Sequence, residues 1–190
     1  MDTNKFRASW TVLNNWASGN WERAIKDYFK LDQFVTPAMA DGRKWHEKWE
    51  QDIIKTKKLP AEFGDKVLAA PVCESKKVVA LASWLDFVFK IDCYDIPTLY
   101  EFKTGKQSSE SYASSMQMPV YAVGATYAGF IIDKAEIYHY DQYLKRVDMS
   151  MLWLTDKMLE FAHNWIITLS GEMQTYLLQN KLYERFGSRG

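Results

Sequence analysis

Asp86, Glu101 and Lys103 are residues whose types and spacing could support metal-assisted chemistry. Two carboxylates about 5 Å apart on neighbouring strands repel each other unless a cation sits between them. Mg²⁺ is commonly held in this way, by one or two carboxylates plus waters. An ammonium beside the ion can orient a water molecule and offset charge as a phosphate is attacked. The same residues also fit ordinary solvated strand faces, so the pattern alone does not name a reaction.

Two neighbouring strands would have to bring these side chains together. The odd-numbered residues from 85 to 91 are all apolar, which predicts a half-buried strand with Asp86 directed away from its apolar face. A second strand is predicted over residues 98–104, with Glu101 and Lys103 on one face and roughly 7 Å apart.

The turn between the two strands decides which residues face each other. We expect its tip near Cys93 and Tyr94, and symmetry about that tip places Asp86 opposite Glu101 or one step away. Asp92 shares the face of Asp86 and is a minor candidate for the same site. An aspartate beside a turn is, however, more commonly a turn-forming residue.

Composition limits the classes of function. The chain has 190 residues, of which 47% are hydrophobic and 15% aromatic, which predicts one ordered domain over residues 1–190. Lysine plus arginine and aspartate plus glutamate number 24 each, so no global positive field draws the protein to a nucleic acid. Any contact with DNA or RNA must therefore come from a local cluster of cations.

Two cysteines, Cys73 and Cys93, are too few for a disulfide framework or a cysteine-based metal centre, and they form no C-x-x-C pair. The N-terminal residues lack the apolar run of a signal peptide, and no segment approaches ~20 uncharged apolar residues. We therefore expect no membrane association and a reducing, cytoplasmic setting.

A helix is predicted over residues 37–57, with Thr36 as its cap and a proline at its first position. Gly42, His46 and Trp49 share one stripe of this helix, so His46 lies inward or along the edge of the core. The residue pattern leaves two roles open for His46, a hydrogen-bonded core residue or a metal ligand.

Gln117 and Tyr121 are one helical turn apart on a second predicted helix. Their amide and phenol could hold a phosphate, a DNA end or Lys103, or they could simply pack. Proline inside a helix breaks a backbone hydrogen bond. Pro119 therefore predicts either a helix that begins near Met118 or a kink.

The remaining pattern predicts a central sheet covered by helices. The expected elements are helices from Ser9 and from Trp21, strands over 66–73 and 77–82 joined by a polar turn, a hairpin over 135–140 and 146–151, and a long helix from Thr155.

Five features in order resemble the PD-(D/E)XK nuclease superfamily, and its RecB-like branch in particular. Asp86 followed by the run EFKTGK at 101–106 is similar to the catalytic core of that branch. Gly42-x-x-x-His46 and Gln117-x-x-x-Tyr121 resemble its upstream and downstream helices, and the segment 9–21 resembles its opening helix.

The resemblance implies an α/β fold with a central mixed β-sheet flanked by helices, the restriction-endonuclease-like core. It implies that Asp86, Glu101, His46 and the backbone carbonyl of Phe102 hold Mg²⁺ or Mn²⁺ and that Lys103 positions or activates the attacking water. Some relatives carry a four-cysteine iron–sulfur cluster, and this sequence lacks the cysteines, so we expect no cluster.

The activity implied is hydrolysis of DNA phosphodiester bonds, with an exonuclease acting on the ends of single- or double-stranded DNA favoured over an endonuclease. Phage or bacterial intracellular settings, and protein partners in recombination or repair, go with such domains. The alternative is a catalytically silent nuclease fold that binds nucleic acid or a protein partner. Retention of Asp86, Glu101 and Lys103 together favours the enzyme, whereas the neutral net charge leaves the path of the substrate unexplained.

Overall fold

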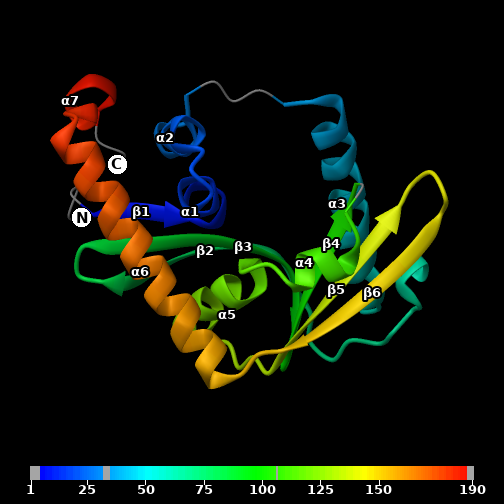
Figure 1. Ribbon diagram of the computed structural model, residues 1–190. Coiled ribbons are helices and arrows are strands. Elements are labelled where there is room, and N and C mark those ends of the chain that lie inside the picture. Colours follow the sequence, from blue (N-terminus) through cyan, green and yellow to red (C-terminus); the bar gives the residue numbers. More distant parts are fainter. Residues whose placement is uncertain (1–4, 32–34, 106, 188–190) are drawn as a thin grey trace.

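A computed structural model describes residues 5–31, 35–105 and 107–187, and it has the predicted α/β architecture of a central mixed sheet flanked by helices (Figure 1). The six-stranded sheet has the order β1-β3-β4-β5-β6, and β2 also pairs with β3. The elements are β1 Phe6–Ser9, α1 Trp10–Ala17, α2 Trp21–Phe29, α3 Pro37–Thr56, the short 3-10 turn η1 Ala61–Phe63, β2 Val72–Ala82, β3 Leu85–Asp95, β4 Thr98–Thr104, α4 Ser109–Ala113, α5 Gln117–Tyr127, β5 Lys134–Asp141, β6 Arg146–Trp153, α6 Asp156–Gln179 and α7 Leu182–Phe186.

Strand β3 organises the sheet, because β1, β2 and β4 all pair with it. β1 and β3 are parallel, as are β4 and β5, and the other pairs are antiparallel. The expected turn at residues 74–76 is wrong: β2 runs unbroken from Val72 to Ala82. Ser75 and Lys76 lie within this ladder, opposite Ile91 and Lys90, so pairing along β3 overrides their polar character.

The hairpin of β3 and β4 turns later than expected. β3 continues to Asp95, which lies opposite Thr98, so the turn falls at Ile96 and Pro97. Cys93 therefore lies opposite Tyr100, and the expected tip at Cys93 and Tyr94 is wrong.

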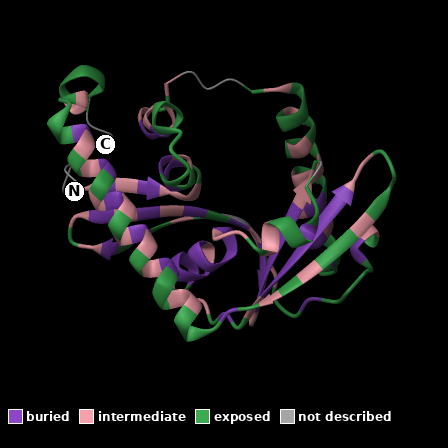
Figure 2. Cartoon of the chain, viewed as in Figure 1, coloured by how far each residue is buried: buried purple, intermediate pink, exposed green. Residues whose placement is uncertain are grey.

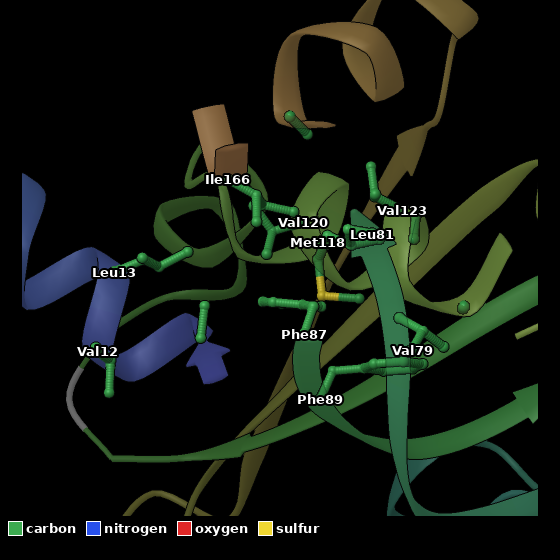
Figure 3. Close-up of a cluster of buried hydrophobic side chains, with 14 of the residues drawn as sticks. Val12, Leu13, Val79, Leu81, Phe87, Phe89, Met118, Val120, Val123 and Ile166 are labelled. Atoms are coloured by element: carbon green, nitrogen blue, oxygen red, sulfur yellow. The ribbon is translucent and has the colours of Figure 1, made fainter. Parts of the chain in front are cut away.

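Two apolar clusters hold the helices to the sheet. The larger one joins α1, α5 and α6 to β2 and β3, and Figure 3 shows Leu13, Phe87, Met118 and Ile166 directed toward one another within it. The second cluster packs Trp49 and Ile53 of α3 against aromatic residues of β4 and β5. α3 and α5 therefore belong to different clusters, and both lie close to the hairpin of β3 and β4.

Local signals set the starts of the helices that approach the hairpin. Thr36 Oγ1 accepts a hydrogen bond from the Met39 amide at 3.2 Å, and Pro37 occupies the first turn of α3, as predicted. α5 begins at Gln117, so Pro119 lies in the first turn, where its missing N–H breaks no helical bond. No helix among the described residues has the length and apolar content needed to cross a membrane.

Candidate active site

Asp92, on β3, lies at the centre of the candidate site. Its neighbours Ile91 and Cys93 belong to different apolar clusters, so Asp92 lies where β3 passes from one to the other. Asp92 Oδ2 accepts a hydrogen bond from the Phe102 amide at 2.9 Å, which ties the aspartate to β4 directly beside Glu101.

Asp86, the aspartate expected here, lies elsewhere. It pairs in register with Arg7 of β1 and Ala80 of β2, and its carboxylate lies 3.5 Å from Lys5 Nζ and 3.9 Å from Arg7 Nε. The prediction that Asp86 faces Glu101 is wrong because the turn falls later than expected. Extending the register of Asp95 opposite Thr98 places Asp92 beside Glu101, and this signal would have identified Asp92 once the turn was known.

Glu101 is buried, with 4% of its surface exposed, and two side chains hydrogen-bond to its Oε1. Lys103 Nζ donates one bond, and Gln117 Nε2 donates the other at 2.9 Å. Lys103 also lies 5.1 Å from the centre of the Tyr112 ring. The predicted pair of Glu101 and Lys103 is therefore joined, and α5 reaches it through Gln117.

Burial and mutual repulsion shape the charges of the two carboxylates. Burial, followed by the negative charge of Asp92, raises the pKa of Glu101 to about 7, although Lys103 acts in the opposite direction. Burial would also raise the pKa of Asp92. The hydrogen bond and charge of His46, the charge of Lys103 and the hydrogen bond from the Phe102 amide together leave that pKa below its ordinary value. Burial would lower the pKa of Lys103, and the neighbouring carboxylates raise it instead.

His46 approaches Asp92 from α3, with its Nδ1 3.4 Å from Asp92 Oδ1. Burial would lower the pKa of His46, but Asp92 and Glu101 raise it. Gly42 lies one turn earlier, and a Cβ at Gly42 would lie 3.1 Å from Thr104 Oγ1. The absence of a side chain there lets α3 approach the end of β4, which explains why glycine precedes His46 by four residues.

Tyr121 lies in the same environment, where burial and the negative charge of Glu101 raise the pKa of its phenol. The structure thus brings together Glu101, Lys103, His46, Gln117 and Tyr121 from the predicted set, with Phe102 bonded through its amide.

His139, on β5, links the end of β4 to β6. Its Nε2 lies 2.8 Å from the Gly105 carbonyl oxygen, and its Nδ1 lies 2.7 Å from Asp148 Oδ1. Asp148 Oδ2 in turn accepts a bond from the Ser109 amide at 2.6 Å. His139 therefore fixes the loop that follows Lys103. Its partners are 34 and 9 residues away in sequence, so no local sequence motif predicts this role of His139.

Two hollows open beside the cluster. One has a volume of about 580 Å³ and is lined in part by Arg43, His46, Lys90 and Lys103. The other, of about 250 Å³, is lined in part by Trp10, Lys76, Lys90 and Tyr121. Lys90 lines both hollows, and each of them has further cationic side chains in its lining.

The donor set suits a hard divalent cation, although the ligands are not gathered around one point. Glu101 is buried and Asp92 is partly buried; a cation would relieve the repulsion between the two carboxylates, and His46 adds an imidazole. Within the described ranges, no three His, Cys, Asp or Glu residues form a ready metal-binding group. Each carboxylate instead contacts a protein side chain, Glu101 the Lys103 ammonium and Asp92 the His46 imidazole.

Comparison with known proteins finds similar structures but no similar sequence. No family model and no curated protein matches the sequence. An alkaline exonuclease from Laribacter hongkongensis aligns with a TM-score of 0.58 and 10% identity over 96% of this chain and 95% of the other. The same enzyme in complex with dAMP gives a TM-score of 0.54 and 9% identity over 94% and 92%.

A second solved structure agrees. A putative exonuclease from Eubacterium rectale aligns with a TM-score of 0.57 and 11% identity over 90% of this chain and 83% of the other. The chain therefore has the α/β fold of these exonucleases.

Proposed function

We propose that this chain is a divalent-metal-dependent deoxyribonuclease of the RecB-like branch, most simply an exonuclease. One observation carries the proposal: Asp92, Glu101, Lys103, His46 and Gln117 converge from two strands and two helices beside a cation-lined hollow. The fold shared with exonucleases supports it. The glycine-to-histidine and glutamine-to-tyrosine motifs support the branch, because both pack around this cluster.

Asp92, Glu101, His46 and the Phe102 carbonyl would hold Mg²⁺ or Mn²⁺. When bound, such an ion supplies Lewis-acid polarisation of a phosphate and lowers the pKa of a water ligand. The Phe102 amide holds Asp92, and Gln117 holds Oε1 of Glu101. Lys103 would orient the attacking water and offset charge on the phosphate.

The chain has no net positive charge, but cationic side chains line the two hollows and form the local cluster that contact with DNA requires. Arg43, Lys76 and Lys90 would contact successive phosphates of a DNA strand that passes Lys103. Trp10 offers a ring on which a base can stack. The dAMP complex of the Laribacter enzyme shows a deoxynucleotide bound by a protein of this fold, which favours DNA as the substrate here.

The test is digestion of end-labelled single- and double-stranded DNA with Mn²⁺, Mg²⁺ or EDTA. We expect metal-dependent release of labelled nucleotides, at least ~100-fold slower in Lys103→Ala, since loss of one group that stabilises developing charge costs about 10²–10³-fold. Lys157→Ala, on the exposed face of α6, is the matched control and should retain activity. A covalently closed circle left intact would identify an exonuclease.

A binding module is the second candidate, and it is favoured by the contacts that already engage each carboxylate, Glu101 with Lys103 and Asp92 with His46. If the DNA stays intact under every metal condition but the protein slows its migration in a gel, the result supports the binding module and contradicts the enzyme.

A further inference from the structure

Strand β6 forms an outer edge of the sheet. It pairs with β5 along its whole length, and α4 packs against it. Among residues 5–31, 35–105 and 107–187, no second strand pairs with it. Figure 2 shows the contrast between the largely buried β5 and the largely exposed β6.

Two backbone hydrogen bonds show which residues of β6 face the open edge. The Leu154 amide donates to the Asp133 carbonyl at 2.9 Å, and the Lys134 amide points toward β4, to the Pro97 carbonyl at 3.5 Å. In an antiparallel pair, residues alternate between bonding the neighbour and pointing away. The even-numbered residues of β6 therefore bond β5, and Val147, Met149, Met151 and Trp153 direct their amides and carbonyls outward.

The outward-directed residues lack the usual protection of a sheet edge. Natural edge strands carry lysine, proline or a bulge, or are very short. β1 has four residues and β2 carries Lys76 and Lys77, whereas all four outward-directed residues of β6 are apolar. Three of them are exposed, Met149 at 52%, Met151 at 48% and Trp153 at 60%.

The strand is complementary to itself. Outward-directed residues can bond only to outward-directed residues, so a second β6 must pair odd positions with odd positions. A twofold axis at Ser150 does this over the whole strand: it places Met149 opposite Met151 and Val147 opposite Trp153 of the second copy. Axes at Met149 or Met151 leave one end of the strand unpaired. With the axis at Ser150, Asp148 meets Leu152, so like charges are not opposed.

We propose that two copies of this chain associate through antiparallel pairing of their β6 strands about a twofold axis at Ser150. The sheet then continues from one copy into the other, and the apolar side chains at the edge pack across the axis. The contact is isologous, so it closes at two copies. An interface made by one strand per copy is small, and we expect a dissociation constant in the micromolar range.

The test is sedimentation equilibrium of the whole chain from about 1 to 100 µM. We expect the wild type to shift from monomer to dimer, and Met149→Lys combined with Met151→Lys to weaken the dimer at least 100-fold because lysines then face lysines. The matched control is Val78→Lys, which changes a similarly exposed apolar residue on β2, at 52% exposure, and should dimerise as the wild type does.

Mixing experiments distinguish a weakened dimer contact from misfolding of the variants. The chain with Met149→Glu and Met151→Glu should also be monomeric alone, yet form a heterodimer when mixed with the double-lysine chain. Circular dichroism should show all variants folded. A wild type that stays monomeric over the whole concentration range overturns the proposal, and a strand of another protein would then be the remaining candidate to pair with β6. A dimer that the lysine pair does not weaken also overturns it, because the contact then lies elsewhere.

Discussion

At the scale of single residues, the candidate site holds two neighbouring carboxylates. The negative charge of Asp92 raises the pKa of the buried Glu101, and Lys103 and His46 contact the pair. Such perturbed groups cluster at functional sites. Asp86 lacks this setting: its two cationic partners lie on and just before β1, and it is only partly buried.

Glu136 shows the opposite arrangement, a buried carboxylate that serves stability. Burial would raise the pKa of Glu136, but hydrogen bonds from Lys134, Lys66 and Tyr138 outweigh it and hold that pKa below its ordinary value. A lowered folded-state pKa contributes stability that is complete above the unfolded pKa and is lost as the pH falls through the folded one.

We therefore expect Glu136→Gln to lower the free energy of unfolding by about 2 kcal/mol at pH 7, because it leaves buried donors without their anion. The difference from wild type should shrink below about pH 4. Urea unfolding across pH 3–8 measures it, with Glu160→Gln on the exposed face of α6 as the control. A difference that stays constant with pH would show that the charge of Glu136 contributes nothing.

At the scale of elements, close packing of α5 on β3 positions Gln117. A Cβ at Gly124 would lie 2.7 Å from Phe89 Cδ1 and 3.1 Å from Phe87 Cδ1, and both rings are buried. Glycine is therefore required at this crossing, although it is a poor helix former.

Gly124→Ala should destabilise the protein by about 1–3 kcal/mol, because overpacking outweighs the gain in helix propensity. Gly171→Ala is the matched substitution, since it is also within a helix and its Cβ would make only an ordinary contact, at 3.9 Å from Trp84. Gly171→Ala should stabilise by up to about 1 kcal/mol. Denaturant unfolding that gave both variants the same stability would contradict the packing argument.

Sequence patterns predicted the elements better than their partners. β4, the hairpin of β5 and β6, and the start of α3 follow from alternation, turn residues and a cap. β1 has only four residues, which are too few for a periodic signal. The polar residues at the centre of β2 were predicted to form a turn, although the strand is continuous. Cys73 and Cys93 lie opposite each other with sulfurs 3.4 Å apart, a proximity that a separation of 20 residues hides.

The sequence predicted the residue types of the candidate site, and it predicted all but one of the residues correctly in position. The exception is the aspartate. The predicted residues Glu101, Lys103, His46 and Gln117 lie together, carried by the short strand β4 and by the two helices α3 and α5. The aspartate was misassigned because β3 continues to Asp95, past the alternating residues 85–91 from which the position of the turn was predicted. A three-residue shift in the turn replaces Asp86 with Asp92 opposite Glu101.

At the scale of the whole molecule, binding of a divalent cation should raise thermal stability, because relief of repulsion between Asp92 and Glu101 is available only in the folded state. We expect the melting temperature to rise with Mn²⁺ concentration. The rise should be larger at pH 8 than at pH 6, since protons compete for Glu101, whose pKa is about 7. Differential scanning calorimetry measures it, with Ca²⁺-free EDTA buffer as the reference. Equal melting temperatures with and without metal would contradict the proposed metal site.

The most direct test of the account compares two aspartates of the same strand in the nuclease assay. Asp92→Asn should reduce metal-dependent DNA hydrolysis at least ~100-fold. Asp86→Asn should stay within about threefold of wild type, because it loses only partly exposed ion pairs worth about 0–1 kcal/mol. Circular dichroism would establish that both variants are folded. Loss of hydrolysis in Asp86→Asn with activity retained in Asp92→Asn would contradict the site described for this protein.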